Sequence, residues 1–483
     1  MARMVQARTL SELRSSGYVA LPVREEMRKN LIEKIRRKEE LFQGILGYEE
    51  TAIPQIENAI LSGHDMIFLG ERGQAKSRLI RHLINFLDPY IPTIIGCEIN
   101  DSPFSPICKR CRDLVAEKGD EVELQWIPRE KRYGEKLATP DVSIADLIGE
   151  VDPIKVAEGK YLSDELTIHF GLIPRTHRGI FAINELPDLA EKVQVGLFNI
   201  MEERDIQIKG YRLRLPLDVF IVASANPEDY TSRGRIITPL KDRFRSQIRT
   251  HYPMTRELEV RIMDQEKKWF PMEGYEVKVP KFMKEIVAEM TMLARKSREV
   301  NQRSGVSVRM AISNYENLLS SAEKRALRLG EREIAPRISD LSSLRASSLG
   351  KMELEYGGEE RSEGEFFEKL LKKTVKEVFD GYCDIEFLKD VVDVFNRGAW
   401  MEVSDLTPSR DYLEIFREVR GLKDIVKGLG VTEESPALLA SAIEFILEGL
   451  HLHNLLNKDV ISGKIQYKGS LGRTIQRAGR EKG

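Results

Sequence analysis

A short loop between residues 70 and 77 carries the residue types that bind a nucleotide phosphate. Its sequence, GERGQAKS, fits the pattern G-x-x-x-x-[G]-K-[ST] at every place but one. In such a loop the backbone N–H groups surround the β-phosphate, and the helix that follows adds its dipole. The Lys76 ammonium would neutralise the β- and γ-phosphates, and the Ser77 hydroxyl would bind Mg²⁺. The predicted phosphate site consists of Gly70, Glu71, Arg72, Gly73, Gln74, Ala75, Lys76 and Ser77.

The one departure from this pattern is Ala75, which stands where glycine is usual. Alanine is tolerated at that place if its φ is negative and its methyl group clears the phosphates. An apolar run at 66–69 precedes the loop, and an amphipathic pattern from residue 79 follows it, which indicates a strand, a loop and a helix. This context favours a phosphate loop over a surface turn that contains Lys-Ser by chance.

A second group of candidate residues follows the apolar run 180–183 in RGIFAINELPDL. Asn184 and Glu185 would emerge at the C-terminal end of a buried strand, where ligands bind in open α/β sheets. Glu185 can polarise a water that attacks the γ-phosphate. Asn184 offers an acceptor oxygen for a metal-bound water but lacks the charge of the more usual aspartate. The bland alternative is a helix-capping Asn beside a solvated Glu.

A third strand end and two arginines complete the candidate chemistry. VFIVASANPEDY indicates a buried strand that ends at Asn226, whose side chain can bond the γ-phosphate or the attacking water. Arg243 in LKDRFR and Arg309 in SGVSVRMAIS are of the type that stabilises charge on a transferred phosphoryl group. Each arginine alone would more often be a surface charge.

Three of the four cysteines stand close together in GCEINDSPFSPICKRC, at Cys97, Cys108 and Cys111. They could bind zinc if a fourth ligand arrived, and His169, His177 or Cys383 could supply it only by folding close. A second hypothesis is a pair of redox-active thiols, and a third is unliganded cysteines in a loop. The sequence leaves all three hypotheses open.

The totals of the chain exclude several classes of protein. Its 483 residues include 75 Lys+Arg and 77 Asp+Glu, a net charge of −2, which does not indicate nucleic-acid or anionic-membrane binding. Four cysteines are too few for a disulfide framework in a chain of this length. Neither a signal peptide nor a membrane span is expected, so a reducing cytoplasm is the expected location.

The order of patterns predicts an α/β domain followed by helices. Between 40 and 250, the apolar runs DMIFLG, PTIIGCEI, GIFAINEL and VFIVASAN alternate with helical stretches, which favours a parallel sheet flanked by helices. RDIQIKGYRLRLP reads as a hairpin. The expected divisions are a charged helical arm at 1–39, an α/β nucleotide-binding core at 40–250, a helical lid at 251–335, a helical C-terminal domain at 336–457 and a basic flexible tail at 458–483.

In the order and spacing of these motifs, residues 40 to 315 resemble AAA+ P-loop ATPases of the group that holds the magnesium-chelatase I subunit and the MoxR proteins. The stretches that carry the resemblance are FQGILGYEE, GERGQAKS, GLIPRTHRGIFAINEL, FIVASANPED and LKDRFR. The resemblance implies that Lys76 and Ser77 are the Walker A pair and that Glu185 is the Walker B glutamate. It further implies that Asn226 is sensor 1, that Arg243 is the arginine finger and that Arg309 is sensor 2. The backbone around Ile45, Leu46 and Gly47 would border the adenine.

The same resemblance implies ATP and Mg²⁺ as ligands, with Ser77, Asn184 and Glu185 around the metal. It also implies a homo-oligomeric ring, usually of six subunits, that works beside a protein with a von Willebrand A domain. Residues 158–179 would be an insertion that reaches partners, and the hairpin at 206–213 would do the same. Ala75, Asn184 and the long helical region after residue 335 depart from a compact I subunit.

The leading interpretation is therefore an ATP-hydrolysing motor that remodels a partner protein or complex. The first alternative is a scaffold that assembles with ATP but hydrolyses little, which Ala75 and Asn184 motivate. The second is a genuine magnesium-chelatase subunit. A transcription activator acting on an alternative sigma factor is disfavoured, because its G-A-F-T-G-A loop is missing from the sequence.

Overall fold

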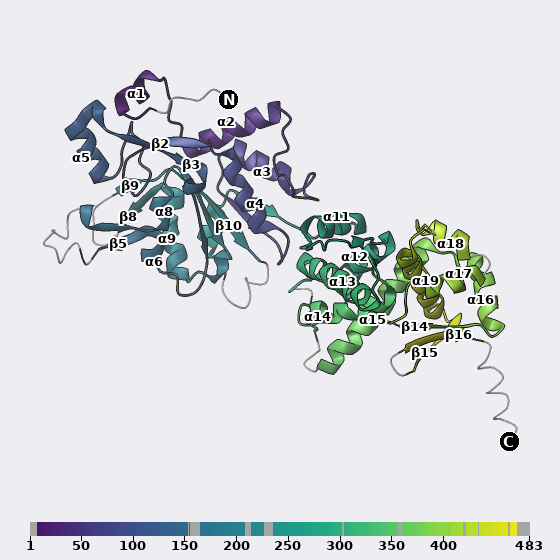
Figure 1. Ribbon diagram of the computed structural model, residues 1–483. Coiled ribbons are helices and arrows are strands. Elements are labelled where there is room, and N and C mark those ends of the chain that lie inside the picture. The colour runs from purple at the N-terminus through teal and green to yellow at the C-terminus, as the bar shows by residue number, and fades with distance from the viewer. Residues whose placement is uncertain are drawn as a thin grey trace. The chain divides into compact units, whose positions relative to one another are not determined.

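The chain folds into two compact units, residues 1–251 and residues 252–483, which are described separately. In Figure 1 the first runs from purple to teal and the second from green to yellow. The computed structural model describes residues 7–152, 154, 165–207, 214–226, 235–301, 304–355, 360–404, 406–418, 422–432, 434–461 and 464–470. Within these ranges no helix is both long enough and apolar enough to cross a bilayer.

The first unit is built on a five-stranded parallel sheet, which confirms the predicted fold class. The strand order is β11-β1-β10-β7-β4, and every neighbouring pair runs parallel. In that order the strands are β11 (Ser246–Arg249), β1 (Met66–Leu69), β10 (Val219–Ala225), β7 (Gly179–Asn184) and β4 (Tyr133–Leu137).

The register of this sheet brings the polar strand ends together. Leu69 of β1 is opposite Ala225 of β10, and Ala223 of β10 is opposite Ile183 of β7. The residues that follow these three strands therefore lie at one edge, the C-terminal edge, where open α/β sheets bind ligands.

Helices cover both faces of the sheet, which explains why its strands read as continuous apolar runs. One face of β10, with Phe220 and Val222, packs in the core that includes α2 (Val23–Arg36), α3 (Ala52–Leu61) and α4 (Lys76–His82). The opposite face, with Ile221 and Ala223, packs in the core that includes α9 (Glu191–Glu202) and α10 (Thr238–Arg243).

The N-terminal residues are less solvated than the expected charged arm. Val23, Met27 and Leu31 of α2 are buried in the first of these cores. Glu26 of the same helix forms a buried ion pair with Arg132, whose Nη2 lies 2.6 Å from a Glu26 carboxylate oxygen. The expectation of a solvated arm is therefore wrong for α2, because one face of that helix belongs to the core of the first unit.

Only the first three residues of the run PTIIGCEI lie in a strand, and the prediction that the run joins the parallel sheet is wrong. The run contains most of β2 (Tyr90–Ile94), which pairs antiparallel with β3 (Leu124–Pro128) in a separate ribbon. The helix α5 (Lys109–Lys118) lies between them in sequence. The parallel sheet is completed instead by β4 and β11.

Two further antiparallel ribbons overlap or border the segments 158–179 and 206–213, where partner-binding insertions are expected. β5 (Gly149–Val151) pairs with β6 (Ile168–Phe170), and β8 (Asp205–Gln207) pairs with β9 (Arg214–Pro216). The β8–β9 pair agrees with the predicted hairpin. Residues 155–164 of the first insertion and 208–213 of the hairpin lie outside the described residues.

The second unit is mainly helical and has one large core, beside a small second cluster of Ala322, Ala326 and Ile334. Buried residues from Met263 to Tyr467 belong to the large core, which crosses the expected division at 335/336. A two-residue parallel pair, β12 (Glu276–Val277) with β13 (Glu333–Ile334), lies in the expected helical lid. The α-helices described in the second unit are α11 (Arg256–Glu266), α12 (Lys281–Lys296), α13 (Val308–Leu329), α14 (Arg345–Ser348), α15 (Glu360–Tyr382), α16 (Lys389–Asn396), α17 (Asp411–Glu418), α18 (Leu422–Gly428) and α19 (Pro436–Leu452).

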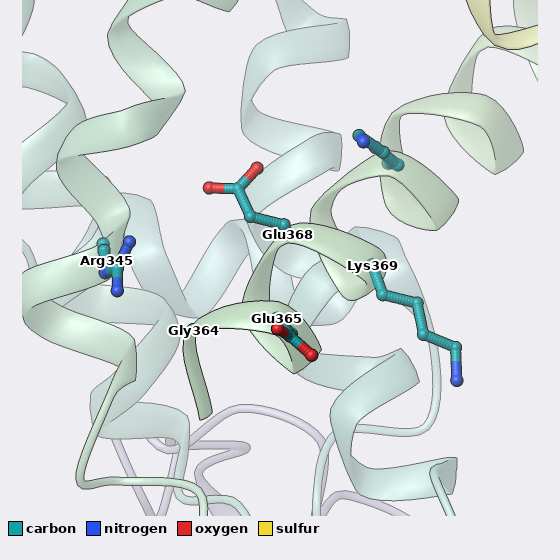
Figure 2. Close-up of a pocket in the computed structure, with 6 residues that line it drawn as sticks. Arg345, Gly364, Glu365, Glu368 and Lys369 are labelled. Atoms are coloured by element: carbon teal, nitrogen blue, oxygen red, sulfur yellow. The ribbon is translucent and has the colours of Figure 1, made fainter. Parts of the chain in front are cut away.

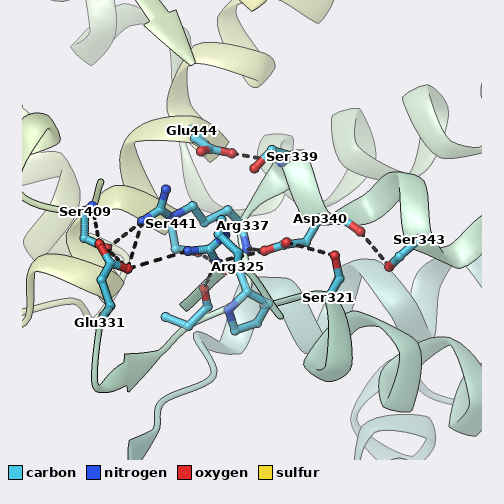
Figure 3. A network of polar contacts seen from close by, with 12 residues as sticks. Ser321, Arg325, Glu331, Arg337, Ser339, Asp340, Ser343, Ser409, Ser441 and Glu444 are labelled. Carbon is cyan, nitrogen blue, oxygen red and sulfur yellow. Dashed lines mark hydrogen bonds and ion pairs between the residues drawn. The ribbon is translucent and has the colours of Figure 1, made fainter. Parts of the chain in front are cut away.

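A buried ionic network also crosses the 335/336 division (Figure 3). Asp340 Oδ2 accepts from Arg325 Nη2 at 2.9 Å and from the backbone N–H of Arg337 at 2.9 Å. Arg337 Nη2 donates to the Ser409 hydroxyl at 2.5 Å. Breaking a buried pair leaves a charge uncompensated, so these contacts hold the segment after α13 in one arrangement.

The prediction of a flexible tail at 458–483 is wrong for the first part of that segment. β14 (Trp400–Val403), β16 (Lys464–Gly469) and β15 (Leu456–Ile461) form a three-stranded antiparallel sheet in that order. Tyr467 is buried, and its hydroxyl donates to Glu448 of α19. The strand is therefore anchored by one aromatic side chain in a sequence otherwise poor in large apolar residues. Residues 471–483 lie outside the described residues.

Candidate nucleotide-binding site

The predicted phosphate loop connects β1 to α4 and is braced by residues behind it. Gln74 is buried, and its Oε1 accepts from the backbone N–H of Glu71 at 3.0 Å and from the Thr250 hydroxyl at 2.8 Å. A Cβ atom at Gly70 would lie 2.0 Å from Thr250 Oγ1, so only glycine fits there. Gly73 has a φ of 76°, in the left-handed region. The loop conformation therefore depends on both glycines of its sequence.

Ala75 has a left-handed backbone, with φ 56° and ψ 16°. The condition under which alanine would be unstrained at this place, a negative φ, is not met. A left-handed conformation costs a residue with a Cβ roughly 1–2 kcal/mol. The chain therefore keeps the backbone shape that glycine usually provides in this motif, and it does so with a strained residue.

Lys76 is buried, with 7% of its surface exposed, and it points back across the loop. Its Nζ donates to the backbone oxygen of Gly70 at 2.5 Å, to that of Glu71 at 2.8 Å and to Asn226 Oδ1 at 2.5 Å. An ammonium group has three N–H donors, and these oxygens can engage all of them. The ammonium is thus fixed at the mouth of the loop.

Asn226 connects Lys76 to Glu185. Its Nδ2 donates to Glu185 Oε2 at 2.7 Å, while its Oδ1 accepts from Lys76. Glu185 follows β7 directly with a φ of 55°, and its backbone N–H donates to the Ser224 hydroxyl at 3.3 Å. The structure thus brings together three predicted site residues, from the start of α4 and from the C-terminal ends of the adjacent strands β10 and β7.

Asn184, the predicted metal-site residue, is buried and uses both ends of its amide. Its Oδ1 accepts from the Ser224 hydroxyl at 3.3 Å, and its Nδ2 donates to Glu135 Oε1 at 2.6 Å. Glu135 lies on β4, the edge strand next to β7. A carboxylate therefore stands beside the position where Asn184 replaces the usual aspartate.

Glu135 was not anticipated from the sequence. Both of its oxygens also accept from Arg81 of α4, at 2.9 Å each. The hydrogen bond from Arg81 is the main reason why the pKa of Glu135 is lowered, so this side chain is ionised at neutral pH. The sequence YGEKL carries no apolar–polar alternation that would indicate a strand here.

The residues expected near the adenine lie next to the loop. Ile45 is buried and Gly47 has a φ of 85°. The following residue, Tyr48, donates its hydroxyl to the backbone oxygen of Gln74 at 2.8 Å. Ser77 is exposed at the second position of α4. The roles of Ile45, Leu46 and Gly47 at the adenine, and of Ser77 at the metal, stay predictions.

The two predicted arginines lie in different units of the chain. Arg243 ends α10, where its Nε lies 3.2 Å from a carboxylate oxygen of Glu202 and its guanidinium lies 4.8 Å from the Phe198 ring centroid. Both partners belong to α9. Arg309 is exposed at the second position of α13, in the second unit. The finger and sensor 2 roles stay predictions.

The structure does bring the three cysteines together. The sulfur atoms of Cys97, Cys108 and Cys111 and a carboxylate oxygen of Asp101 all lie within 4.8 Å of one another. The fourth group is Asp101 rather than His169 or His177. The His177 Nδ1 accepts instead from the backbone N–H of Asp218 at 3.0 Å, and Cys383 belongs to the second unit.

A groove of about 650 Å³ in the second unit does not match the predicted chemistry (Figure 2). Its lining is mainly charged side chains of α15, including Glu365, Glu368 and Lys369, with Arg345 of α14. Small-molecule sites are usually apolar with a few polar groups, so this groove is not a candidate nucleotide site.

The parallel sheet, the loop after β1 and the polar ends of β10 and β7 agree with the AAA+ P-loop fold that the sequence resemblance implies. Two curated relatives support this class at low identity. The chain is 27% identical over 223 residues to the magnesium-chelatase subunit ChlI of Euglena gracilis. It is 26% identical over 144 residues to the uncharacterized protein YeaC of Bacillus subtilis (strain 168). The resemblance to the chelatase I group is therefore confirmed, although no family model matches the chain.

These matches are partial. They cover 43% of this chain and 58% of ChlI, and 30% of this chain and 42% of YeaC. Among solved structures, the chain is similar to a complex between BchI and BchD of magnesium chelatase, with 17% identity, a TM-score of 0.35 and coverage of 68% of this chain and 98% of that one. NtrX from Brucella abortus in complex with ATP gives 15% identity, a TM-score of 0.39 and coverage of 83% and 72%.

Proposed function

We propose that this chain binds ATP with Mg²⁺, hydrolyses it, and uses hydrolysis to remodel a partner protein or complex. The observation that carries this proposal is the continuous chain of hydrogen bonds from Lys76 through Asn226 to Glu185. It places a cation, an amide and a carboxylate at neighbouring strand ends. Phosphoryl transfer depends on positioning and charge stabilisation by groups of these types.

Lys76 is the group that would bind the phosphates. The Lys76 ammonium now donates to the carbonyl oxygens of Gly70 and Glu71. A phosphate that enters the loop would offer this ammonium an anionic acceptor in their place. The carbonyl oxygens carry only a partial charge, whereas a phosphate oxygen carries a full negative charge, so the exchange adds Coulomb attraction and favours binding. Asn226 then stands between the bound phosphate and Glu185.

Glu185 is the group that would activate water. Its carboxylate is held by Asn226 and its backbone by Ser224, so it is oriented before any substrate arrives. A carboxylate in this position can accept a proton from the attacking water. Mg²⁺ bound with ATP would supply charge neutralisation, and the oxygen donors of Ser77, Asn184 and Glu185 suit its preference for hard ligands.

A ring of six subunits would complete the site. Arg243 is partly exposed and contacts α9 rather than Lys76 or Asn226, which suits a residue that acts on the nucleotide of a neighbouring subunit. Arg309 would act as the second sensor. The partner that we expect is a protein with a von Willebrand A domain, which is what the resemblance of the sequence motifs implies.

Steady-state phosphate release tests the proposal. Glu185→Gln keeps a side-chain oxygen that can accept from Asn226, so ATP binding should persist. Loss of a general base should lower phosphate release by about 100-fold or more. Glu191→Gln, at the exposed first residue of α9, is the matched control and should hydrolyse ATP like the wild type.

Two outcomes would contradict hydrolysis as the function. One is no phosphate release from the wild type although ATP binds, which would leave an ATP-gated scaffold. The other is release that Glu185→Gln and Glu191→Gln reduce equally, since the carboxylate at the end of β7 would then have no special role.

A further inference from the structure

The cysteine group consists of residues from the loop after β2 and from the start of α5. It is not part of the phosphate loop. Cys97 follows β2, Cys108 is the N-cap of α5, and Cys111 lies in the first turn of that helix. Asp101 is in the connecting loop. Cys111 and Asp101 are fully buried, with 0% of each residue exposed.

The distances within this group suit a single metal ion. All four ligand atoms lie within 4.8 Å of one another. Tetrahedral zinc with Zn–S bonds of about 2.3 Å places its sulfur atoms about 3.8 Å apart. An iron–sulfur cluster would hold its cysteines farther apart, because each thiolate binds a different iron atom. The cysteines are free rather than joined in a disulfide.

Backbone donors already point at two of the sulfur atoms. The Cys111 N–H donates to Cys108 Sγ at 3.4 Å, and the Asp101 N–H donates to Cys97 Sγ at 3.3 Å. Such bonds stabilise thiolates and orient metal ligands. Asp101 accepts the N–H groups of Ile107 and Cys108, each at 3.0 Å, which fixes the loop. Each carboxylate oxygen has a second lone pair that remains for a metal.

We propose that Cys97, Cys108, Cys111 and Asp101 bind one structural Zn²⁺. Three sulfur atoms and one carboxylate complete a tetrahedral coordination by protein ligands, which is typical of structural rather than catalytic zinc sites. The metal also explains the burial of this many ionisable groups, since buried charges must be paired or coordinate a metal.

The neighbouring packing gives such a metal a structural role. Cys108 and Cys111 belong to a small separate core with Leu10 and Leu13 of α1 (Leu10–Ser15), and with β2 and β3. Small cores often need a metal or disulfide to be stable. Zinc would tie the start of α5 to the end of β2 and so support the docking of the N-terminal segment.

Zinc content of the purified full chain tests the site directly. The wild type, prepared under reducing conditions, should contain about one zinc per chain, and Cys108→Ser and Cys97→Ser should lose most of it. Cys383→Ser is the matched control, because Cys383 is also buried but belongs to the second unit, and it should keep the metal. Zinc retained after replacement of both Cys108 and Cys111 would overturn the proposal.

Cobalt substitution keeps the test independent of variants that fold poorly. Wild-type chain stripped of metal and refilled with Co²⁺ should show an intense thiolate-to-cobalt absorption and tetrahedral visible bands. Asp101→Asn should weaken cobalt binding while the thiolate absorption persists. Absence of both zinc and a cobalt–thiolate band in folded wild type would overturn the site. So would a Cys108–Cys111 disulfide found by mass spectrometry in protein that binds no metal, which would instead indicate redox-active thiols.

Discussion

At the residue scale, the phosphate loop carries a strained alanine. Ala75 has a φ of 56° at a place where glycine is usual. The same loop has no room for a side chain at Gly70 and has a left-handed φ at Gly73. The strain affects the stability of the fold, because it is present before any nucleotide binds.

Ala75→Gly should therefore raise the free energy of unfolding by about 1 kcal/mol, since glycine adopts the left-handed region without a Cβ clash. Chemical denaturation measures it. Ala116→Gly, at an exposed position inside α5, is the control and should lower stability by about 1 kcal/mol through helix propensity. Equal destabilisation by both changes would show that Ala75 is not strained.

Glu135 supplies a negative charge beside Asn184, and this too is a property of single residues. Glu135→Gln should leave ATP binding nearly unchanged but raise the Mg²⁺ concentration for half-maximal hydrolysis by about 10-fold, since loss of an outer partner typically costs 10- to 100-fold in metal affinity. Glu130→Gln, at an exposed residue before the same strand, is the control. An unchanged Mg²⁺ dependence in the Glu135 variant would rule out this role.

The local sequence was sufficient to predict some of these site residues but not others. Lys76, Glu185 and Asn226 could be predicted because each follows an apolar run that indicates a buried strand. Glu135 could not, since its place beside Asn184 depends on which strand lies next to β7. The left-handed φ of Ala75 could not be predicted either, because alanine rarely adopts that conformation.

At the scale of elements, the sequence predicted strands better than their partners. The run 92–99 is apolar enough for a strand, but it pairs with β3, about thirty residues later. The outer strands β4 and β11 were missed because edge strands carry polar residues, among them Glu135, Lys136 and Arg249. β15 and β16 were missed because Gly and Lys dilute their apolar pattern, although Tyr467 anchors them.

Burial of His177, in the turn before β7, makes the free energy of unfolding of the chain depend on pH. Burial is the main cause that lowers its pKa from 6.5 to about 3. Between these values the unfolded chain binds a proton that the folded chain does not, so stability falls as the pH decreases from about 6.5 toward 3. Protonation of Nδ1 would also break its bond with the Asp218 N–H.

His177→Gln should remove this contribution, so the variant should lose less stability than the wild type between pH 7 and pH 4. Denaturation midpoints at a series of pH values measure the difference. His169→Gln, at an exposed histidine of β6, is the control and should follow the wild-type profile. A His177 variant with the wild-type pH slope would contradict the argument.

At the scale of the whole molecule, the account requires several copies of the chain to act together. The groups for phosphate binding and water activation lie in the first unit, whereas Arg243 contacts α9 rather than those groups. The proposed function therefore assigns Arg243 to the site of a neighbouring subunit.

Mixing two inactive variants tests this arrangement. Glu185→Gln and Arg243→Ala should each hydrolyse little ATP, because each lacks one half of every site. In a random mixture of equal amounts, roughly a quarter of the interfaces combine an intact Glu185 with an intact neighbouring Arg243, so partial activity should return. A mixture as inactive as its components, with both variants still assembling, would contradict a shared site.

The most direct measurement is calorimetric titration of the chain with ATP and Mg²⁺. We predict saturable binding for the wild type and for Lys118→Ala, a change at an exposed residue that ends α5. Lys76→Ala should bind about 10- to 100-fold more weakly, because it loses the charge-assisted bonds at the mouth of the loop. Binding heats and affinity equal to those of the wild type, in a Lys76→Ala chain shown to be folded by circular dichroism, would contradict the proposal that this loop holds the triphosphate.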